Sequence, residues 1–425
     1  GVVVEFQDTS DDLFIDGTLI AEGNASNRIR FTSSKTEKAP NQWGAVLIRD
    51  TSNDVETRLN YCDFEYGGAF RAELLALQQS SPTVENCRFS NSRDRGVTLQ
   101  GSSSRIAFNA FQSNTGYAIV MDLASFPVFE QNSVDGNGSD SIGVEGGTLA
   151  TSGRWVRDNI PYTIMHDVIV GVESILTIDP GGIVQFQDVS DDLIVDGSLV
   201  AIGTVDQPIR FTSDETERAP NQWGFVWFRD PGSDEASVLQ HCHFEYGGAF
   251  RNEMLRLQDA SIRVESCVFQ SSRERGLTLL NSQASVIHCQ FLNNADYAIV
   301  MDVNSFPAFS GNSATNNAEG IGNAIGILGG TLNMDGTWVR DSIPYTILND
   351  VSISEASNLT IAPGVTLQFQ NPADDLFVDG TLIAEGTEEL PIIFTSNEQV
   401  KAPNQWGFVW GAGQISEKGS LSLFF

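Results

Sequence analysis

The chain has 425 residues, and 55 acidic against 24 basic side chains give it a formal net charge of −31. This charge disfavours DNA, RNA and anionic membranes as partners, because all three are themselves negative. The hydrophobic content of 41% is enough for a continuous core and argues against general disorder. No apolar run approaches the length of a membrane span, so we expect no membrane insertion in this segment.

The first part of the chain predicts short β-strands separated by turns. Apolar and polar residues alternate there at the period of a half-buried strand, and Asp16-Gly17 is a dipeptide typical of turns. Longer loops are expected at about 33–42 and 65–73, and a single helical turn near 72–76. The expected strands are 2–6, 13–15, 18–21, 28–32 and 44–48.

Further along, residues recur at a spacing of about 22. The segments LALQ (75–78), VTLQ (97–100) and IVMD (119–122) align at this spacing, and two further columns run beside them. Such a recurrence is one coil of a solenoid in which like residues stack, strand over strand. The two further columns are Cys62, Cys87, Asn109 and Asn132, and Phe64, Phe89 and Phe111.

All the cysteines of the chain fall on the inward column. We therefore interpret them as small, buried, apolar residues rather than as a disulfide framework. Stacked neighbours would meet the demanding geometry of a disulfide only with difficulty, so the cysteines do not report the redox compartment. The five residues are Cys62, Cys87, Cys242, Cys267 and Cys289.

A second, much longer repeat overlies the short one. The hexapeptide APNQWG at 39–44 returns at 219–224 and again at 402–407. The second interval is three residues longer, and we place the insertion in the Gly- and Asn-rich turn at 316–323. We predict one continuous solenoid of about eight coils per repeat, cut from a longer array. Its predicted parts are residues 1–180, 181–363 and a partial repeat 364–425.

Three phrases carry a resemblance that covers essentially the whole chain. They are LTIxPGxxxxF at 176–186, LxVDGxLxAxGT at 193–204 and PIxFTS at 208–213. Together with VENCxF turns such as 84–89, they resemble bacterial extracellular right-handed parallel β-helix proteins of the pectate-lyase-like superfamily. The resemblance implies an all-β, right-handed parallel β-helix and an extracellular or cell-surface location. It leaves function open, because the superfamily includes lyases, glycosidases, phage tailspikes and adhesins.

An acidic motif, Asp-Asp-x-x-x-Asp-Gly, recurs in all three repeats. Oxygen ligands at this density are a candidate Ca²⁺ site. The alternative is that the third aspartate is the turn residue before glycine and the others solubilise an edge loop. The candidate metal ligands are Asp11, Asp12, Asp16, Asp191, Asp192, Asp196, Asp374, Asp375 and Asp379.

Two arginine-bearing turns can be compared with the superfamily. Its lyases use Ca²⁺ with carboxylates to bind uronates and an arginine as base, which makes Arg93 or Arg95 a candidate by resemblance. The same turn recurs at 272–276, however, whereas the lyases build one cleft per chain. The alternative is that these arginines pair with acidic neighbours such as Glu65 and Asp94.

A pair of loops combines aromatic, amide and charged residues, a set able to stack on sugar rings. The alternative is that Trp43 and Phe70 cap the local core beneath a long loop. The candidate carbohydrate-binding residues are Trp43, Tyr66, Arg71, Trp223, Tyr246 and Arg251.

We predict a non-catalytic structural segment of a large secreted or cell-surface repeat protein, such as a stalk, adhesin or extracellular fibre. Its expected partners are further copies of itself end to end, other surface components, and possible glycans. Copying whole blocks lengthens a rod, whereas catalysis gains little from it. None of the four histidines recurs in the neighbouring repeat, so repeated histidine chemistry is disfavoured. The alternatives are a polysaccharide lyase or glycosidase, and a carbohydrate-binding β-helix.

Overall fold

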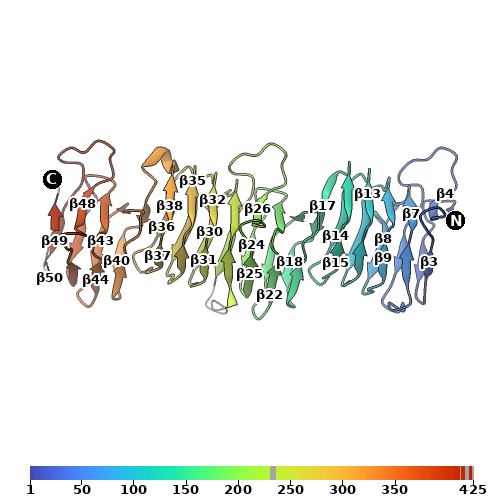
Figure 1. The fold of residues 1–425 in the computed structure, drawn as a ribbon, viewed down its shortest axis with the longest axis horizontal. Coiled ribbons are helices and arrows are strands. Elements are labelled where there is room, and N and C mark those ends of the chain that lie inside the picture. The colour runs from blue at the N-terminus through green and yellow to red at the C-terminus, as the bar shows by residue number, and fades with distance from the viewer. Residues whose placement is uncertain (230–235, 412, 417–420, 424–425) are drawn as a thin grey trace. The chain divides into compact units, whose positions relative to one another are not determined.

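The computed structural model describes residues 1–229, 236–411, 413–416 and 421–423, and these are almost entirely short strands and turns (Figure 1). The chain forms two compact units, unit 1 (Gly1–Gln187) and unit 2 (Asp188–Phe425). Within each unit the sheet strands are parallel, and each strand usually pairs with the third strand after it in the chain. No helix in the described part is long and apolar enough to cross a membrane.

Unit 1 is built from three main sheets and the start of two more. The first sheet holds β1 (Val3–Phe6), β4 (Ile29–Ser33), β7 (Cys62–Glu65), β10 (Arg88–Ser90), β13 (Ala110–Gln112) and β16 (Ser133–Asp135). The second holds β2 (Leu13–Ile15), β5 (Val46–Ile48), β8 (Glu73–Gln78), β11 (Arg95–Gln100), β14 (Tyr117–Met121), β17 (Ser139–Val144), β20 (Tyr162–Ile164) and β23 (Ile183–Phe186). The third holds β3 (Ile20–Glu22), β6 (Arg58–Asn60), β9 (Thr83–Glu85), β12 (Arg105–Ala107) and β15 (Val128–Glu130). Two pairs follow: β18 (Gly147–Leu149) with β21 (Val168–Val170), and β19 (Gly153–Trp155) with β22 (Ile175–Ile178).

Unit 2 repeats this arrangement. One sheet holds β26 (Ile209–Ser213), β29 (Cys242–Glu245), β32 (Val268–Gln270), β35 (Gln290–Leu292) and β38 (Ser313–Thr315). The long sheet holds β24 (Leu193–Val195), β27 (Val226–Arg229), β30 (Glu253–Gln258), β33 (Arg275–Leu280), β36 (Ile299–Met301), β39 (Ile325–Ile327), β42 (Tyr345–Ile347), β45 (Thr366–Phe369), β48 (Ile392–Ser396) and β51 (Leu421–Leu423). A third holds β25 (Ser198–Ile202), β28 (Val238–Gln240), β31 (Arg263–Glu265), β34 (Ser285–Ile287) and β37 (Ala308–Ser310). Two shorter sheets hold β40 (Gly330–Leu332), β43 (Val351–Ile353), β46 (Leu376–Val378) and β49 (Val409–Gly411), and β41 (Gly336–Trp338), β44 (Asn358–Ile361), β47 (Thr381–Ala384) and β50 (Gln414–Ser416).

The predicted inward columns are confirmed as ladders of like residues. Val97 of β11 pairs with Leu75 of β8 on one side and with Ile119 of β14 on the other. The phenylalanine column is a stack, with the ring of Phe89 centred 5.0 Å from Phe64 and 5.1 Å from Phe111. Stacked, fully buried rings of this kind fill the interior of the coil from one turn to the next.

The cysteine and asparagine column is a hydrogen-bonded ladder. The N–H of Cys62 donates to Sγ of Cys87 at 3.4 Å, and the N–H of Cys87 donates to Oδ1 of Asn109 at 2.8 Å. The ladder continues from Asn109 to Oδ1 of Asn132 at 3.1 Å. The five cysteines are free and buried, as the sequence predicted, and burial raises the pKa of the Cys267 thiol.

Corresponding strands of successive repeats lie on different sheets. In unit 1, β1 belongs to the first sheet, but β23, its counterpart in the next repeat of the sequence, belongs to the second. In unit 2, β26 and its later counterpart β48 likewise belong to different sheets. The two members of each pair are offset by twenty-two in strand number, which at three strands per coil is seven coils and one strand over. The estimate of eight coils was too high because some coils are long; Leu13, for example, pairs with Val46, thirty-three residues on.

Three local predictions can be compared with the described loops. The turn at 316–323 contains the short 3-10 turn η2 (Asn317–Gly320), where the insertion was placed. The long loops follow β4 and β7 as expected, and Figure 1 shows the equivalent loops after β26 and β48 rising above the strands of unit 2. The helical turn expected near 72–76 is wrong, because these residues begin β8. The apolar side chains of this segment are buried and its main chain pairs with neighbouring strands. These tertiary contacts outweigh helical propensity.

Candidate functional site

The recurring polar residues of unit 1 meet on the outer side of its second sheet, where β8 begins. Oδ1 of Asp12 accepts the N–H of Ala45 at 3.0 Å, and Gly44 is needed there because a Cβ would lie 1.9 Å from that oxygen. Arg71 donates from Nε and Nη2 to Oδ2 of Asp12, at 3.1 and 2.9 Å. The aspartate therefore fastens the β4–β5 loop and the β7–β8 loop at the same point.

A buried carboxylate lies at the first residue of β8. Glu73 is only 8% exposed, and its Oε2 accepts the hydroxyl of Thr98 at 3.2 Å. In the register of β8 with β11, Glu73 is the partner of Arg95. Burial raises the pKa of Glu73 to about 7, while Thr98, Arg95 and Arg71 act in the opposite direction.

Unit 2 contains the same constellation with one added cation. Oδ1 of Asp192 accepts the N–H of Phe225 at 3.0 Å, and Oε2 of Glu253 accepts the hydroxyl of Thr278 at 3.1 Å. Glu253 is fully buried, and Nη2 of Arg256 lies 2.5 Å from its Oε1. Burial again raises the pKa of Glu253, and Arg256 is the largest opposing influence.

The tryptophans of the predicted carbohydrate site belong to the core. Trp43 and Trp223 are fully buried, and each donates its indole N–H to a main-chain oxygen, that of Glu65 at 2.8 Å and that of Glu245 at 2.7 Å. Trp43 also stacks on Phe6, with ring centres 4.1 Å apart. These rings are enclosed and cannot stack on a glycan, so for them the core-capping alternative is the correct one.

The remaining members of that prediction stand at the surface. Tyr66 and Tyr246 are half-buried, with φ of 68° and 69°, and Arg71 and Arg251 are exposed beside their aspartates. The expectation that Phe70 caps the core is wrong, because its side chain is 78% exposed. The main chain of Gly67 packs against Trp43 instead, since a Cβ there would meet the Trp43 ring at 2.7 Å. A glycan site on the tyrosines and arginines stays a prediction.

The aspartates proposed as Ca²⁺ ligands are distributed among separate partners. Asp11, Asp191 and Asp374 accept main-chain N–H groups within their own turns, at 2.8 to 2.9 Å. Asp12, Asp192 and Asp375 accept the N–H that follows the next Trp-Gly pair. Asp16 and Asp196 pair with Arg49 and Arg229, and Asp379 follows the end of β46 in the third copy.

These separate partnerships do not fit a calcium site. The structure contains, over the residues it describes, no group of three or more His, Cys, Asp or Glu side chains arranged to hold a metal ion. Hard cations need several oxygen ligands converging on one point, and here they diverge. Ca²⁺ binding therefore stays a prediction that the geometry does not support.

Each arginine turn contains two arginines, and among the described residues one of them is ion-paired and the other is not. Arg95 lies 3.5 Å from Asp94 and 3.6 Å from Glu145, and its counterpart Arg275 lies 3.1 Å from Asp296. Glu65, the other acid considered, faces Arg30 at 3.6 Å instead. The ion-pair interpretation thus holds for Arg95 with Asp94. Arg93 is exposed and forms no ion pair with any described residue.

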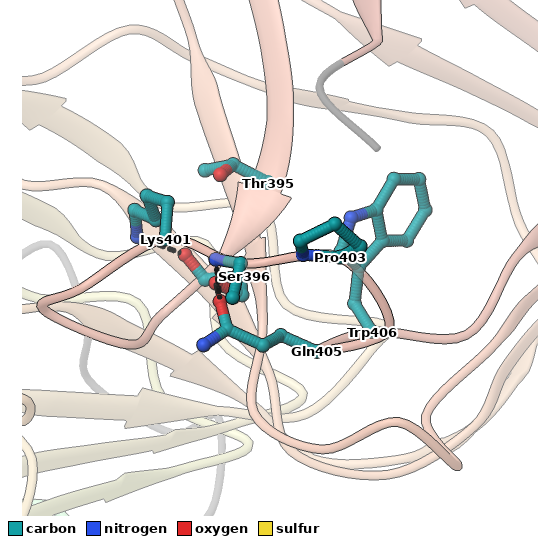
Figure 2. Close-up of a pocket in the computed structure, with 7 residues that line it drawn as sticks. Thr395, Ser396, Lys401, Pro403, Gln405 and Trp406 are labelled. Atoms are coloured by element: carbon teal, nitrogen blue, oxygen red, sulfur yellow. Dashed lines mark hydrogen bonds between the residues drawn. The ribbon is translucent and has the colours of Figure 1, made fainter.

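A small pocket lies inside the loop that follows β48, the third copy of the APNQWG loop (Figure 2). Nζ of Lys401 donates to the main-chain oxygen of Ser396, and Oε1 of Gln405 accepts the Ser396 hydroxyl at 2.9 Å. Trp406 stacks on Phe369, with ring centres 4.7 Å apart. These side chains bond to one another and close the loop onto itself. The lining residues are Thr395, Ser396, Lys401, Ala402, Pro403, Gln405 and Trp406.

The sequence did not single out the buried glutamates. Glu73 falls at the end of the predicted loop 65–73, and Thr98 belongs to a predicted column with no site role. A signal was available: a lone glutamate directly before an apolar strand recurs as Glu253, at the equivalent position of the next repeat. This pattern predicts a carboxylate at the first residue of a buried strand, and not a solvated acid within a loop.

Comparison with protein families agrees with this geometry. The model described as "Right handed beta helix region" matches residues 19–165 and 230–337, more than half of the chain. The model described as "Pectate-lyase like beta helix domain" matches residues 330–420. Searches of curated proteins and of solved structures gave no match.

Proposed function

Because the chain belongs to the right-handed β-helix family, we propose that it is a non-catalytic structural segment of a large secreted or cell-surface repeat protein. Such a segment serves as a stalk, an adhesin or part of an extracellular fibre. Its partners are further copies end to end or other surface components. The predicted alternatives are a polysaccharide lyase or glycosidase acting along the helix, and a carbohydrate-binding β-helix.

One observation carries the proposal: the residues that recur from repeat to repeat are bonded within the scaffold. Asp12 and Asp192 each fasten two loops, and Trp43 and Trp223 each anchor a loop to the coil after it. A duplicated catalytic centre would instead keep its acid and base directed at a substrate. Among the described residues, the recurring groups other than the buried glutamates act as internal links, and such links are what stacking further coils requires.

The ladders also supply a means of bearing load along the coil axis. Nδ2 of Asn109 donates to the main-chain oxygen of Val84 at 3.0 Å and to Oδ1 of Asn132 at 3.1 Å. Nδ2 of Asn294 does the same with Phe269 and Asn317, at 3.1 and 2.9 Å. Each side chain spans neighbouring coils in addition to the strand pairing, so separating coils requires breaking both.

The test is incubation of the protein with polyuronates and with neutral glycans, each with and without Ca²⁺. We expect no unsaturated or reducing ends above a buffer control. Release of either would overturn the structural proposal and favour the enzymatic alternative. Electron microscopy of the native material adds a second readout, since continuous fibres or surface stalks are expected and dispersed single globules would contradict the proposal.

A further inference from the structure

Three segments of the chain match the motif Asn-x-Ser/Thr, the acceptor sequence for N-linked glycosylation. They begin at Asn24, Asn137 and Asn358. A motif this short also arises by chance, so the sequence alone does not say which of the three can be modified. The atom that receives the glycan is the side-chain amide nitrogen, Nδ2. A usable site must leave that nitrogen without an internal partner and must place the whole motif at the surface.

Two of the motifs fail these requirements. Asn137 is half-buried, and its Nδ2 donates to the main-chain oxygen of Phe111 at 3.0 Å and to Oδ1 of Asp140 at 2.7 Å. Asn358 is half-buried as the first residue of β44, and its Nδ2 donates to Oδ1 of Asp335 at 2.9 Å. In both motifs the amide nitrogen already bonds to the preceding coil, and a glycan on it would break that bond.

The motif at Asn24 meets both requirements. It lies in the turn between β3 and β4, and Asn24, Ala25 and Ser26 are all exposed. The main chains of Asn24 and Asn27 bond to each other in both directions, at 3.2 and 3.1 Å, and so close the turn. Oδ1 of Asn24 accepts the N–H groups of Ser26 and Asn27, at 3.1 and 2.9 Å, whereas its Nδ2 donates to none of the residues that the structure describes. The carboxamide is therefore held by its oxygen, and its nitrogen is left for a reaction.

The equivalent turns of the later repeats show that this turn does not require an asparagine. Thr204 and Thr387 stand at the same position, and their Oγ1 atoms accept the N–H groups of Gln207 and Leu390, at 3.0 Å in both turns. Both threonines are exposed. Thr387 follows β47, which pairs with β44 on one side and with β50 on the other. The turn is thus exposed even where coils lie on both sides of it, and the amide nitrogen is what unit 1 adds.

We propose that Asn24 is the acceptor of an N-linked oligosaccharide, which is transferred from an isoprenoid diphosphate donor. Nδ2 of Asn24 forms a bond to the anomeric carbon of the first sugar, and the bond from that carbon to the diphosphate oxygen breaks. The amide proton passes to the departing lipid diphosphate. Ser26 supplies the hydroxyl group that the motif requires, on the same exposed turn. The proposal rests on the secreted or cell-surface location of the proposed function, because this transfer takes place outside the cytoplasm.

The experiment supplies the folded full chain with a purified oligosaccharyltransferase and its lipid-linked oligosaccharide, and mass spectrometry of the intact protein and its peptides locates the product. Ser26→Ala removes the motif but keeps Asn24 and the main-chain N–H that it accepts, whereas Ser26→Thr keeps the motif. Thr204→Asn combined with Asp206→Ser builds the motif in the equivalent turn of unit 2. A synthetic peptide of residues 20–30 presents the sequence without the fold, and circular dichroism checks each variant.

We expect the unmodified chain to gain one oligosaccharide, at Asn24, and none at Asn137 or Asn358. The Ser26→Ala protein should form at least tenfold less product, the Ser26→Thr protein should retain it, and the unit 2 variant should gain a second oligosaccharide. The proposal is overturned if the folded chain stays unmodified at Asn24, whether or not the peptide reacts, or if Asn137 or Asn358 is modified in its place. Such a failure leaves the structural role intact, since that role is tested separately by the release of glycan ends.

Discussion

Unit 1 and unit 2 stabilise an equivalent buried glutamate in different ways. Both bury a glutamate at the entrance to the equivalent strand, and both give it a threonine hydroxyl, Thr98 or Thr278. Unit 2 adds Arg256 within 2.5 Å of Glu253, whereas unit 1 has Ala76 at that place and Glu73 forms no ion pair with a described residue. Burial raises the pKa of both glutamates, and in unit 2 the added guanidinium of Arg256 opposes that rise directly.

The phenylalanine stack of the interior shows no comparable difference. Phe64, Phe89 and Phe111 of unit 1 stack as Phe244, Phe269 and Phe291 do in unit 2, with ring centres about 5 Å apart in both. An inward side chain touches copies of itself above and below, so a change at one level strains its neighbours.

The largest expected effect is on the interior, where the two units should be equivalent. Phe89→Ala and Phe269→Ala each remove the middle ring of a buried stack, and each should lower the free energy of unfolding by about 4 kcal/mol. Denaturant titration of both variants measures this. A loss below about 1 kcal/mol in one unit only would contradict the equivalence of the two interiors.

The next effect concerns the added cation of unit 2. Arg256→Ala leaves Glu253 buried and unpaired, which should cost about 3 kcal/mol at pH 8. The loss should shrink at pH 5, because a glutamate without its guanidinium takes up a proton as Glu73 does. Unfolding at the two pH values measures the difference. An equal loss at both would show that packing, and not charge, is what Arg256 supplies.

A third effect follows from the raised pKa of Glu73. Its folded pKa of about 7 lies above the ordinary value of 4.5, so the folded state holds the extra proton and stability falls as pH rises between these values. Glu73→Gln should remove that fall and stabilise the protein at pH 8 by an amount on the order of 2 kcal/mol. Thermal unfolding from pH 4 to 8 tests the sign. A variant with the unmodified pH dependence would assign the fall to other groups.

The smallest effect separates the two aspartate–arginine pairs. Arg71 makes two hydrogen bonds to Asp12, whereas Arg251 lies 3.9 Å from Asp192. A double-mutant cycle on Asp12 and Arg71 should give a coupling of about 0.5 to 1 kcal/mol, and the cycle on Asp192 and Arg251 a smaller one. Equal couplings in the two cycles would mean that the difference in geometry does not change the contribution of the ion pair to stability.

The sequence predicted the fold well because stacking leaves a periodic trace. The 22-residue column of Val97 and the aromatic column of Phe89 follow from register, and register repeats along the chain. Prediction was weaker for the site, since Trp43 and Phe70 look alike as loop aromatics. In the folded chain Trp43 is fully buried, whereas Phe70 is exposed. The aspartate motif likewise suggested converging ligands, but the turns direct the carboxylates to different N–H groups.

What the sequence alone determined is thus the architecture of the coil: parallel strands, inward ladders of Phe, Cys and Asn, and long repeats marked by the returning APNQWG loop. The tertiary structure alone decided which polar residues lie inside, which meet across coils, and on which sheet each copy falls. The physical reason is that a ladder depends on residues one coil apart, a spacing visible in the chain. The environment of the outward residues depends on loops of unequal length that fold over one another. The length of a loop does not reveal which residues it will cover.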